Sequence, residues 1–144
     1  MTNQKTIEKP KISPDEYRKI LKGIEIENIV LTSTEAYRKA TFDGELPVET
    51  EVRSNYIQKE DQFFTINCTL NLTAGTKQDN PVIRVKCEYE LVFKTEYKIT
   101  DDFFEVYKQL NLITSIWPFF REFVYNITSR MYLPPLTIPL FKVI

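Results

Sequence analysis

The sequence predicts an α+β fold, in which a four-stranded antiparallel sheet has helices packed on one of its faces. Between residues 24 and 93, apolar and polar residues alternate with a period of two. Such alternation is typical of antiparallel strands that are covered on one side only. After residue 100, apolar residues recur at steps of three and four, which is typical of amphipathic helices. The chain has 144 residues, which is the size of one such domain.

A short helix is predicted before the sheet, from Pro14 to about Lys22. Ser13 is suited to be its N-cap, proline is favoured at the first helical position, and Glu16 completes a capping box. Gly23 is suited to end the helix. We therefore expect residues 1–23 to form an N-terminal extension and residues 24–144 to form the main domain.

The first strand is predicted to run from Ile24 to about Tyr37. Ile24 and Ile26 alternate in one phase, whereas Ile29 and Leu31 alternate in the other. A shift of one residue between the two pairs indicates a β-bulge.

Three more strands are predicted to form a meander, at about 48–56, 64–72 and 83–93, after a connecting loop at 40–47. With the first strand, they make a Greek-key-like sheet. The polar loop at 74–81 is centred near residue 77, which predicts that Cys68 and Cys87 oppose each other on the covered side of the sheet. We expect both to be free, buried thiols.

Two helical segments are predicted for the C-terminal third. Thr100 is suited to be an N-cap, and Asp101 and Asp102 fall where the positive end of a helix favours acids. Pro118 is expected to kink the helix or to begin a second one. The apolar stripe comprises Phe103, Tyr107, Leu110, Ile116, Phe120, Phe123, Ile127 and Met131.

This stripe is wider than the contact with one sheet requires. A helix that covers a single sheet needs one apolar face, and the excess predicts a second partner, most simply another copy of the chain. The residues expected at that oligomer interface are Ile116, Trp117, Phe119, Phe120, Phe123 and Val124.

The composition argues against several functional classes. The chain has no histidine, only three glycines, and neither a GxxxxGK nor a GxGxxG motif, so we expect no enzyme activity and no cofactor. The two cysteines are too few for a zinc site. The net charge is −1 and both signs are interspersed, so we expect no nucleic-acid partner. No apolar run is long enough to span a membrane and no signal peptide is visible, which predicts a cytoplasmic protein.

The C-terminal third resembles the signature of the SecB family of protein-export chaperones. That signature has an apolar pair, Phe-Pro-Tyr, a small residue and Arg-Glu, followed by Ser-Arg and a Pro-x-Leu-x-Leu tail. The matching segments here are Ile116–Glu122 (IWPFFRE), Thr128–Arg130 (TSR) and Leu133–Pro139 (LPPLTIP). Together with the strand layout, the resemblance covers roughly residues 24–144.

The resemblance implies an ATP-independent holdase that assembles as a dimer of dimers and binds unfolded, apolar polypeptide segments. Its clients would be preproteins or an antitoxin. Typical members are more acidic and have a further C-terminal tail that docks on the SecA motor, whereas this sequence ends at Ile144, so delivery to SecA stays open. A solitary chaperone, or one that serves a toxin–antitoxin or defence system, fits this difference. The positions that match the family's client groove are Phe42, Leu46, Val48, Val52, Ile138, Leu140 and Phe141.

Two functions from other classes stay open at this point. One is an interaction or structural protein that has the same fold without client binding. The other is a binder of a small apolar ligand. Suppression of aggregation would identify the holdase, and recovery of a bound apolar ligand would identify the third class.

Overall fold

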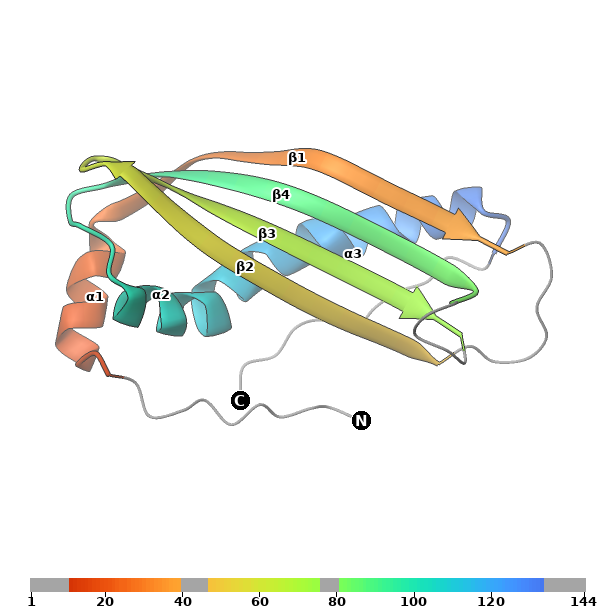
Figure 1. Ribbon diagram of the computed structural model, residues 1–144, viewed down its shortest axis with the longest axis horizontal. Helices are drawn as coiled ribbons and strands as arrows, with labels where there is room; N and C mark the ends of the chain where they lie inside the picture. The colour runs from red at the N-terminus through yellow and green to blue at the C-terminus, as the bar shows by residue number, and fades with distance from the viewer. Residues whose placement is uncertain (1–10, 40–46, 76–80, 134–144) are drawn as a thin grey trace.

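The computed structural model describes residues 11–39, 47–75 and 81–133, and it has the predicted α+β architecture (Figure 1). A four-stranded antiparallel sheet forms one layer, and two successive helices cross its covered face. The elements in chain order are α1 (Pro14–Lys22), β1 (Ile24–Arg38), β2 (Val48–Glu60), β3 (Phe63–Ala74), β4 (Ile83–Thr95), α2 (Asp101–Tyr107), a π-helical segment (Lys108–Leu112) and α3 (Ile113–Arg130).

The strand order in the sheet is β1-β4-β3-β2, and every neighbouring pair is antiparallel. Strands β2, β3 and β4 form the predicted meander, and β1 lies beside β4. In β3 and β4, buried positions alternate with half-buried ones along almost the whole strand. The two central strands therefore have one side in the hydrophobic core and one open side, as the alternation predicted.

The register of β3 against β4 differs by two residues from the prediction. Cys68 opposes Tyr89, and Cys87 opposes Leu70, so the two cysteines are diagonal neighbours and not a direct pair. A slip of two residues leaves every side chain on the same face, so the apolar pattern is equally satisfied by both registers. In the observed register Phe64 opposes Phe93, and their rings stack with centroids 4.6 Å apart. Both thiols are buried and free, as expected.

Strand β1 has two irregularities in its pairing with β4. The first lies between Ile26 and Asn28, where the sequence predicted a bulge. The second lies between Leu31 and Ser33 and was not predicted. Thr32 lies in the second bulge, and its hydroxyl donates a hydrogen bond to the Glu88 carbonyl oxygen.

Helix α1 begins and ends as its sequence predicts, and it belongs to the common core. The Ser13 hydroxyl accepts a hydrogen bond from the Glu16 N–H, and Gly23 is the C-cap. The Tyr17 ring stacks on Phe103 at 5.1 Å, and its hydroxyl donates to Asn111 Oδ1 at 2.5 Å. Ile20 is buried in the same hydrophobic cluster as the sheet residues. Thus α1 is anchored to the helix layer, and not only to the start of β1.

The helix layer departs from regular α-helical geometry at Lys108–Leu112, before the proline. Thr100 caps α2, as predicted, by accepting the Phe103 N–H. Pro118 lies inside α3 and begins no helix, since the second helix starts at Ile113. The expectation that Pro118 begins the second helix is therefore wrong. In the turn before it, the Thr114 and Ser115 hydroxyls donate to backbone carbonyls four residues earlier.

Candidate functional site

The helix layer crosses the sheet diagonally, and the contacts at its two ends show this (Figure 1). At one end α2 is joined to β2: the Tyr56 hydroxyl donates to Asp101 Oδ1 at 2.6 Å, and the Ile99 N–H donates to Gln58 Oε1 at 2.8 Å. At the other end, the chain just after α3 is joined to β1, because Arg38 donates to the Met131 carbonyl at 2.6 Å. A diagonal crossing covers the central strands and leaves parts of both edge strands uncovered.

One uncovered part is the first half of β2. Val48, Thr50 and Val52 oppose the buried Ala74, Leu72 and Leu70 of β3, so their side chains lie on the same side of the sheet as the core. Val48 is nevertheless 40% exposed and Val52 37% exposed. We call Val48, Thr50 and Val52 the β2 strip.

The strip ends where α2 begins to cover the strand. Ser54 is half-buried, and the Tyr56 ring contacts Phe104 with centroids 4.8 Å apart. Burial, followed by the hydrogen bond to Asp101 and the charge of Asp101, raises the pKa of Tyr56 to about 12. At neutral pH the Tyr56 hydroxyl is therefore protonated, and it can donate the hydrogen bond that joins β2 to α2.

The second uncovered part lies on β1, the opposite edge strand. Ile26 and Leu31 are on the core side, opposite Phe93 and Tyr89, and they are 41% and 40% exposed. Val30 lies on the open side and is 48% exposed. The alternation in the sequence predicts that these residues belong to a strand, but it does not mark them as a candidate surface. The alternation alone shows which face a residue takes, and not whether a helix covers it.

The structure describes only two of the seven predicted groove residues. Val48 and Val52 lie together on the β2 strip. The other five, Phe42, Leu46, Ile138, Leu140 and Phe141, lie outside the described residues.

Most of the residues predicted for an oligomer interface lie in the core of the single chain. Ile116, Phe120 and Val124 have no exposed surface, and Trp117 has little. Phe123 is half-buried, and Phe119 is 47% exposed. The width of the apolar stripe is explained in large part by contacts within the chain. Of these six residues, mainly Phe119 and Phe123 have surface that a second copy can contact.

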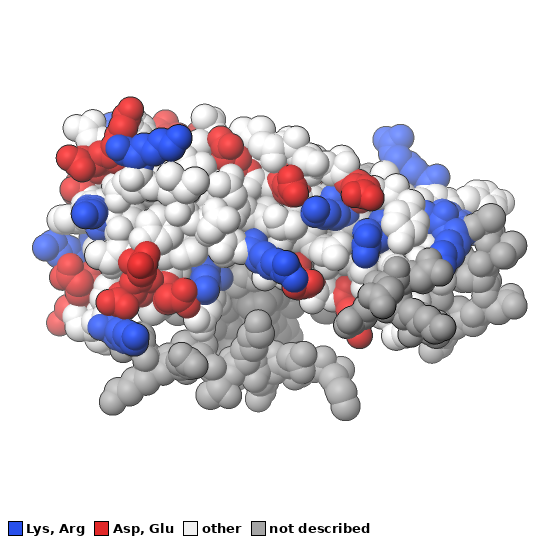
Figure 2. All heavy atoms as spheres, viewed as in Figure 1, with Lys and Arg blue, Asp and Glu red and all other residues white. Residues whose placement is uncertain are grey.

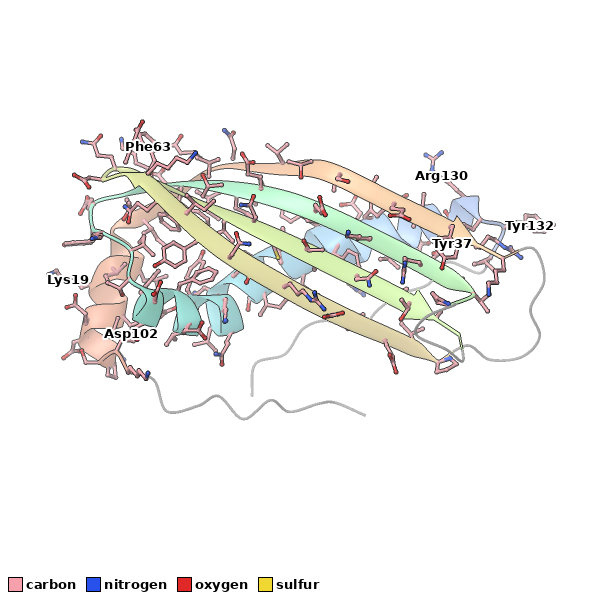
Figure 3. The ribbon with its side chains drawn as sticks, viewed as in Figure 1. Lys19, Tyr37, Phe63, Asp102, Arg130 and Tyr132 are labelled. Atoms are coloured by element: carbon pink, nitrogen blue, oxygen red, sulfur yellow. The ribbon has the colours of Figure 1, made fainter. Side chains whose placement is uncertain are left out.

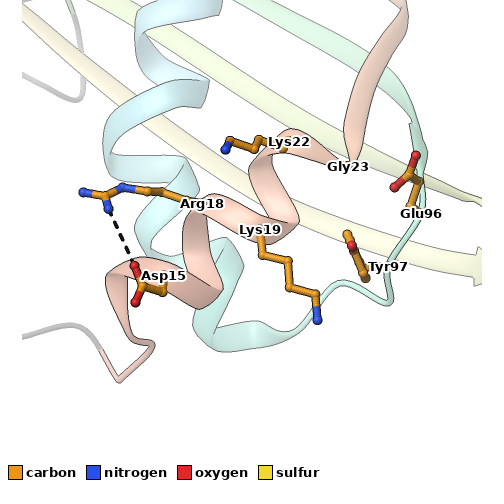
Figure 4. A pocket seen from close by; sticks show the side chains of 7 residues that line it. All are labelled: Asp15, Arg18, Lys19, Lys22, Gly23, Glu96 and Tyr97. Atoms are coloured by element: carbon orange, nitrogen blue, oxygen red, sulfur yellow. Dashed lines mark ion pairs between the residues drawn. The ribbon is translucent and has the colours of Figure 1, made fainter.

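The open side of the sheet and the outer surface of α1 carry charged side chains of both signs (Figure 2). One open hollow of about 480 Å³ lies between α1 and the segment after β4, lined by Asp15, Arg18, Lys19, Lys22, Gly23, Glu96 and Tyr97 (Figure 4). Another of about 380 Å³ lies on the open side of the sheet, lined by Glu35, Glu51, Arg53, Thr69, Asn71, Arg84, Lys86 and Glu88. Charged groups dominate both linings, so neither hollow favours a small apolar ligand.

Further features bear on the chemistry of the described residues. No group of three or more His, Cys, Asp or Glu residues in the described part of the chain is placed to hold a metal ion. None of the helices in the described ranges is long and apolar enough to cross a membrane. Burial raises the pKa of the Cys68 thiol to about 11, and it also raises that of Cys87. Both shifts disfavour the thiolate, which is the reactive form of cysteine.

The sheet order and the position of the helices define a SecB-like fold. Among solved structures, the chain is similar to Rv1957, a SecB-like chaperone of Mycobacterium tuberculosis, in complex with a ChAD peptide from the HigA1 antitoxin Rv1956. The TM-score is 0.71 at 21% sequence identity, and the alignment covers 85% of this chain and 92% of that one. A protein of unknown function from Streptococcus agalactiae aligns with a TM-score of 0.45 at 10% identity, over 81% of this chain and 97% of that one. No family model and no curated protein matches the sequence.

Proposed function

We propose that this chain is a non-enzymatic, ATP-independent chaperone that holds unfolded or extended apolar segments of other polypeptides. The observation that carries the proposal is the β2 strip: two valines and a threonine on the core side of an edge strand that the chain's own helices leave exposed. An exposed apolar strip beside a sheet edge suits an extended chain, because it offers apolar contacts along a line. The SecB-like fold, and the antitoxin peptide bound to Rv1957, support this choice of partner.

The proposed client is a polypeptide that has not folded, such as a preprotein or an antitoxin, and the proposed compartment is the cytoplasm. Service to an antitoxin is the better supported choice, because the similar structure was solved with such a peptide. Delivery to SecA has no comparable support. Binding of this kind needs neither a cofactor nor nucleotide hydrolysis, since exposed apolar area supplies the affinity.

A matched pair of variants on one strand tests the proposed function. Val48→Asp places a charge on the β2 strip, whereas Ile57→Asp places one on the open side of β2, where Ile57 is 48% exposed. Both positions are exposed, so neither change should unfold the domain. We expect the parent and the Ile57 variant to suppress light scattering by luciferase diluted out of guanidinium, and the Val48 variant to suppress it much less. Equal suppression by both variants would remove the β2 strip from the proposal, and no suppression by the parent would remove the chaperone function.

We also propose that the chain forms a homotetramer through two self-complementary surfaces. One is the outer side of α3, where Phe119 and Tyr125 are 47% and 48% exposed. The other is the edge strand β1, with Ile26, Val30 and Leu31. Two different surfaces that each pair with their own copy generate a dimer of dimers.

A further inference from the structure

The hydrogen bonds between β2 and β3 show which residues of β2 direct their backbone N–H and C=O groups away from the sheet. The sheet order places β2 at one edge. The Gly75 N–H donates to the Pro47 carbonyl at 3.2 Å, and the next pair in the register is Val48 with Ala74. In an antiparallel ladder, residues that bond to the neighbouring strand alternate with residues that point away from it. The odd-numbered residues of β2 therefore bond to β3, and the even-numbered ones direct their N–H and C=O groups outward.

The hydrogen bonds between β3 and β4 independently support this assignment for β2. The Thr95 N–H donates to the Gln62 carbonyl at 2.8 Å, so even-numbered residues of β3 bond to β4. The odd-numbered residues of β3, such as Thr69 and Asn71, are then left to bond to β2. They oppose Arg53 and Glu51, which are odd-numbered residues of β2.

The outward backbone groups and the exposed apolar side chains thus belong to the same residues. Val48, Thr50 and Val52 form the β2 strip, and along the edge they also present N–H and C=O groups with which no strand in the described part of the chain pairs. The pairing of β2 with β3 is regular from Val48 to Ile57, whereas the other edge strand, β1, is interrupted by two bulges. Bulges are one way in which proteins protect an edge from pairing, and this part of β2 lacks them.

We propose that a client segment binds to this edge as an added β-strand, paired with Thr50 and Val52 through its backbone. The inference rests on the proposed function and states how the client is held. Every second side chain of the added strand would lie on the helix side, beside Val48 and Val52. The edge from Val48 to Ser54 is about 20 Å long at 3.3 Å per residue. The recognised class of segment is therefore about seven residues in extended form, with apolar residues at alternate positions and no proline where its N–H faces β2.

Amide hydrogen exchange followed by NMR tests the pairing directly, with reduced, carboxymethylated α-lactalbumin as a permanently unfolded client. In the chain alone, the amides of Thr50, Val52 and Ser54 should exchange fast, and those of Glu51 and Arg53, which bond to β3, should exchange slowly. Saturating client should slow the three even-numbered amides at least tenfold and leave the odd-numbered ones unchanged. Unchanged even-numbered amides in the saturated complex would overturn strand addition. Slow even-numbered amides before client is added would overturn it too, because the chain itself would then occupy the edge.

Two variants at one position give a second test. Thr50→Pro removes an outward N–H without removing a bond to β3, and proline is tolerated at such edge positions. Thr50→Ala keeps that N–H. By fluorescence anisotropy with labelled client, we expect the proline variant to bind at least tenfold more weakly than the alanine variant, because the two differ in the backbone donor and both lack the threonine side chain. If the proline variant has a non-native circular dichroism spectrum, the exchange experiment on the parent decides.

These outcomes separate the two proposals. If the parent does not suppress aggregation in the light-scattering assay, the proposed function fails. If the parent suppresses aggregation while the proline and alanine variants bind client equally, the chaperone function stands and only strand addition fails.

Discussion

Val48 and Ile57 lie on the same edge strand and are similarly exposed, at 40% and 48%, yet they have different surroundings. Val48 is on the core side of the sheet, at a place that the diagonal helix layer does not cover. Ile57 is on the open side, as is Phe63, which lies near the β2–β3 turn (Figure 3). Exposure alone therefore does not identify a site. The side of the sheet and the cover above it have to be known for each residue.

The two cysteines provide a test of the covered face at the level of single residues. Both thiols are almost fully buried, and burial raises the pKa of Cys68 to about 11. At pH 8 only about one Cys68 thiol in a thousand would be ionised, and the thiolate is the reactive form. We expect maleimide labelling of both cysteines to be slow in the folded chain and fast in guanidinium.

A control thiol on the open side makes this labelling experiment quantitative. In a variant without Cys68 and Cys87, Asn55→Cys places a thiol on the exposed, open side of β2. It should react at least a hundredfold faster than the native thiols. Rapid labelling of Cys68 and Cys87 in the folded chain would mean that the helices do not cover this face.

At the level of the elements, a few polar contacts hold the helix layer in its diagonal position. Tyr56 and Gln58 of β2 bind the start of α2, and Tyr17 of α1 binds Asn111 in the π-helical segment. These contacts lie at one end of the sheet, and none of the helices in the described ranges lies above the first half of β2. The free length of the β2 strip therefore depends on where α2 is attached.

Removal of the Tyr56 hydroxyl should weaken this attachment. Tyr56→Phe deletes the donor to Asp101 and keeps the ring that packs on Phe104. We expect a loss of about 1 kcal/mol in the free energy of unfolding, which is typical of a single intramolecular hydrogen bond. Tyr132→Phe, at a 96% exposed position after α3, is the matched control and should change this free energy by less than about 0.5 kcal/mol. Chemical denaturation measures both, and equal values would show that the bond to Asp101 does not hold α2.

At the level of the whole molecule, α3 has a buried side toward the sheet and an exposed side toward solvent. Phe120 is fully buried, and its neighbour Phe119 is 47% exposed. The buried side stabilises the chain, and we assign the exposed side to the contact with a second copy. On the assembly proposal, the adjacent residues Phe119 and Phe120 would serve assembly and folding separately.

Aspartate at each of the two positions should give different results. Phe120→Asp buries an unpaired carboxylate at a cost of several kcal/mol, so we expect the domain to unfold. Phe119→Asp should leave the circular dichroism spectrum native and shift the tetramer toward smaller species in sedimentation velocity. A parent chain that sediments as a 17.1 kDa monomer at micromolar concentration would contradict the assembly proposal. A folded Phe119→Asp tetramer would remove α3 from the interface.

The sequence by itself determined which face each residue of β2, β3 and β4 takes, where α1 and α2 begin, and that the chain is similar to SecB. These features depend on local physical chemistry: Ser13 and Thr100 cap helices through their own hydroxyl groups, and the alternation in β3 leaves one choice of buried face. The SecB-type segments were recognisable because they are short and contiguous. Val48 and Val52 were found by that resemblance, and the structure places both on one exposed strip.

Only the tertiary structure decided the register of β3 against β4, the coverage of the sheet and the use of the wide apolar stripe on α3. A slip of two residues preserves the alternation, so contacts between distant residues had to select the register, and the observed register is the one that stacks Phe64 on Phe93. Likewise, Ile116 and Val124 are apolar whether the sheet or a second copy covers them. A hydrophobic pattern shows which side chains tend to be buried. Whether the sheet or a second copy buries them depends on how the helices cross the sheet.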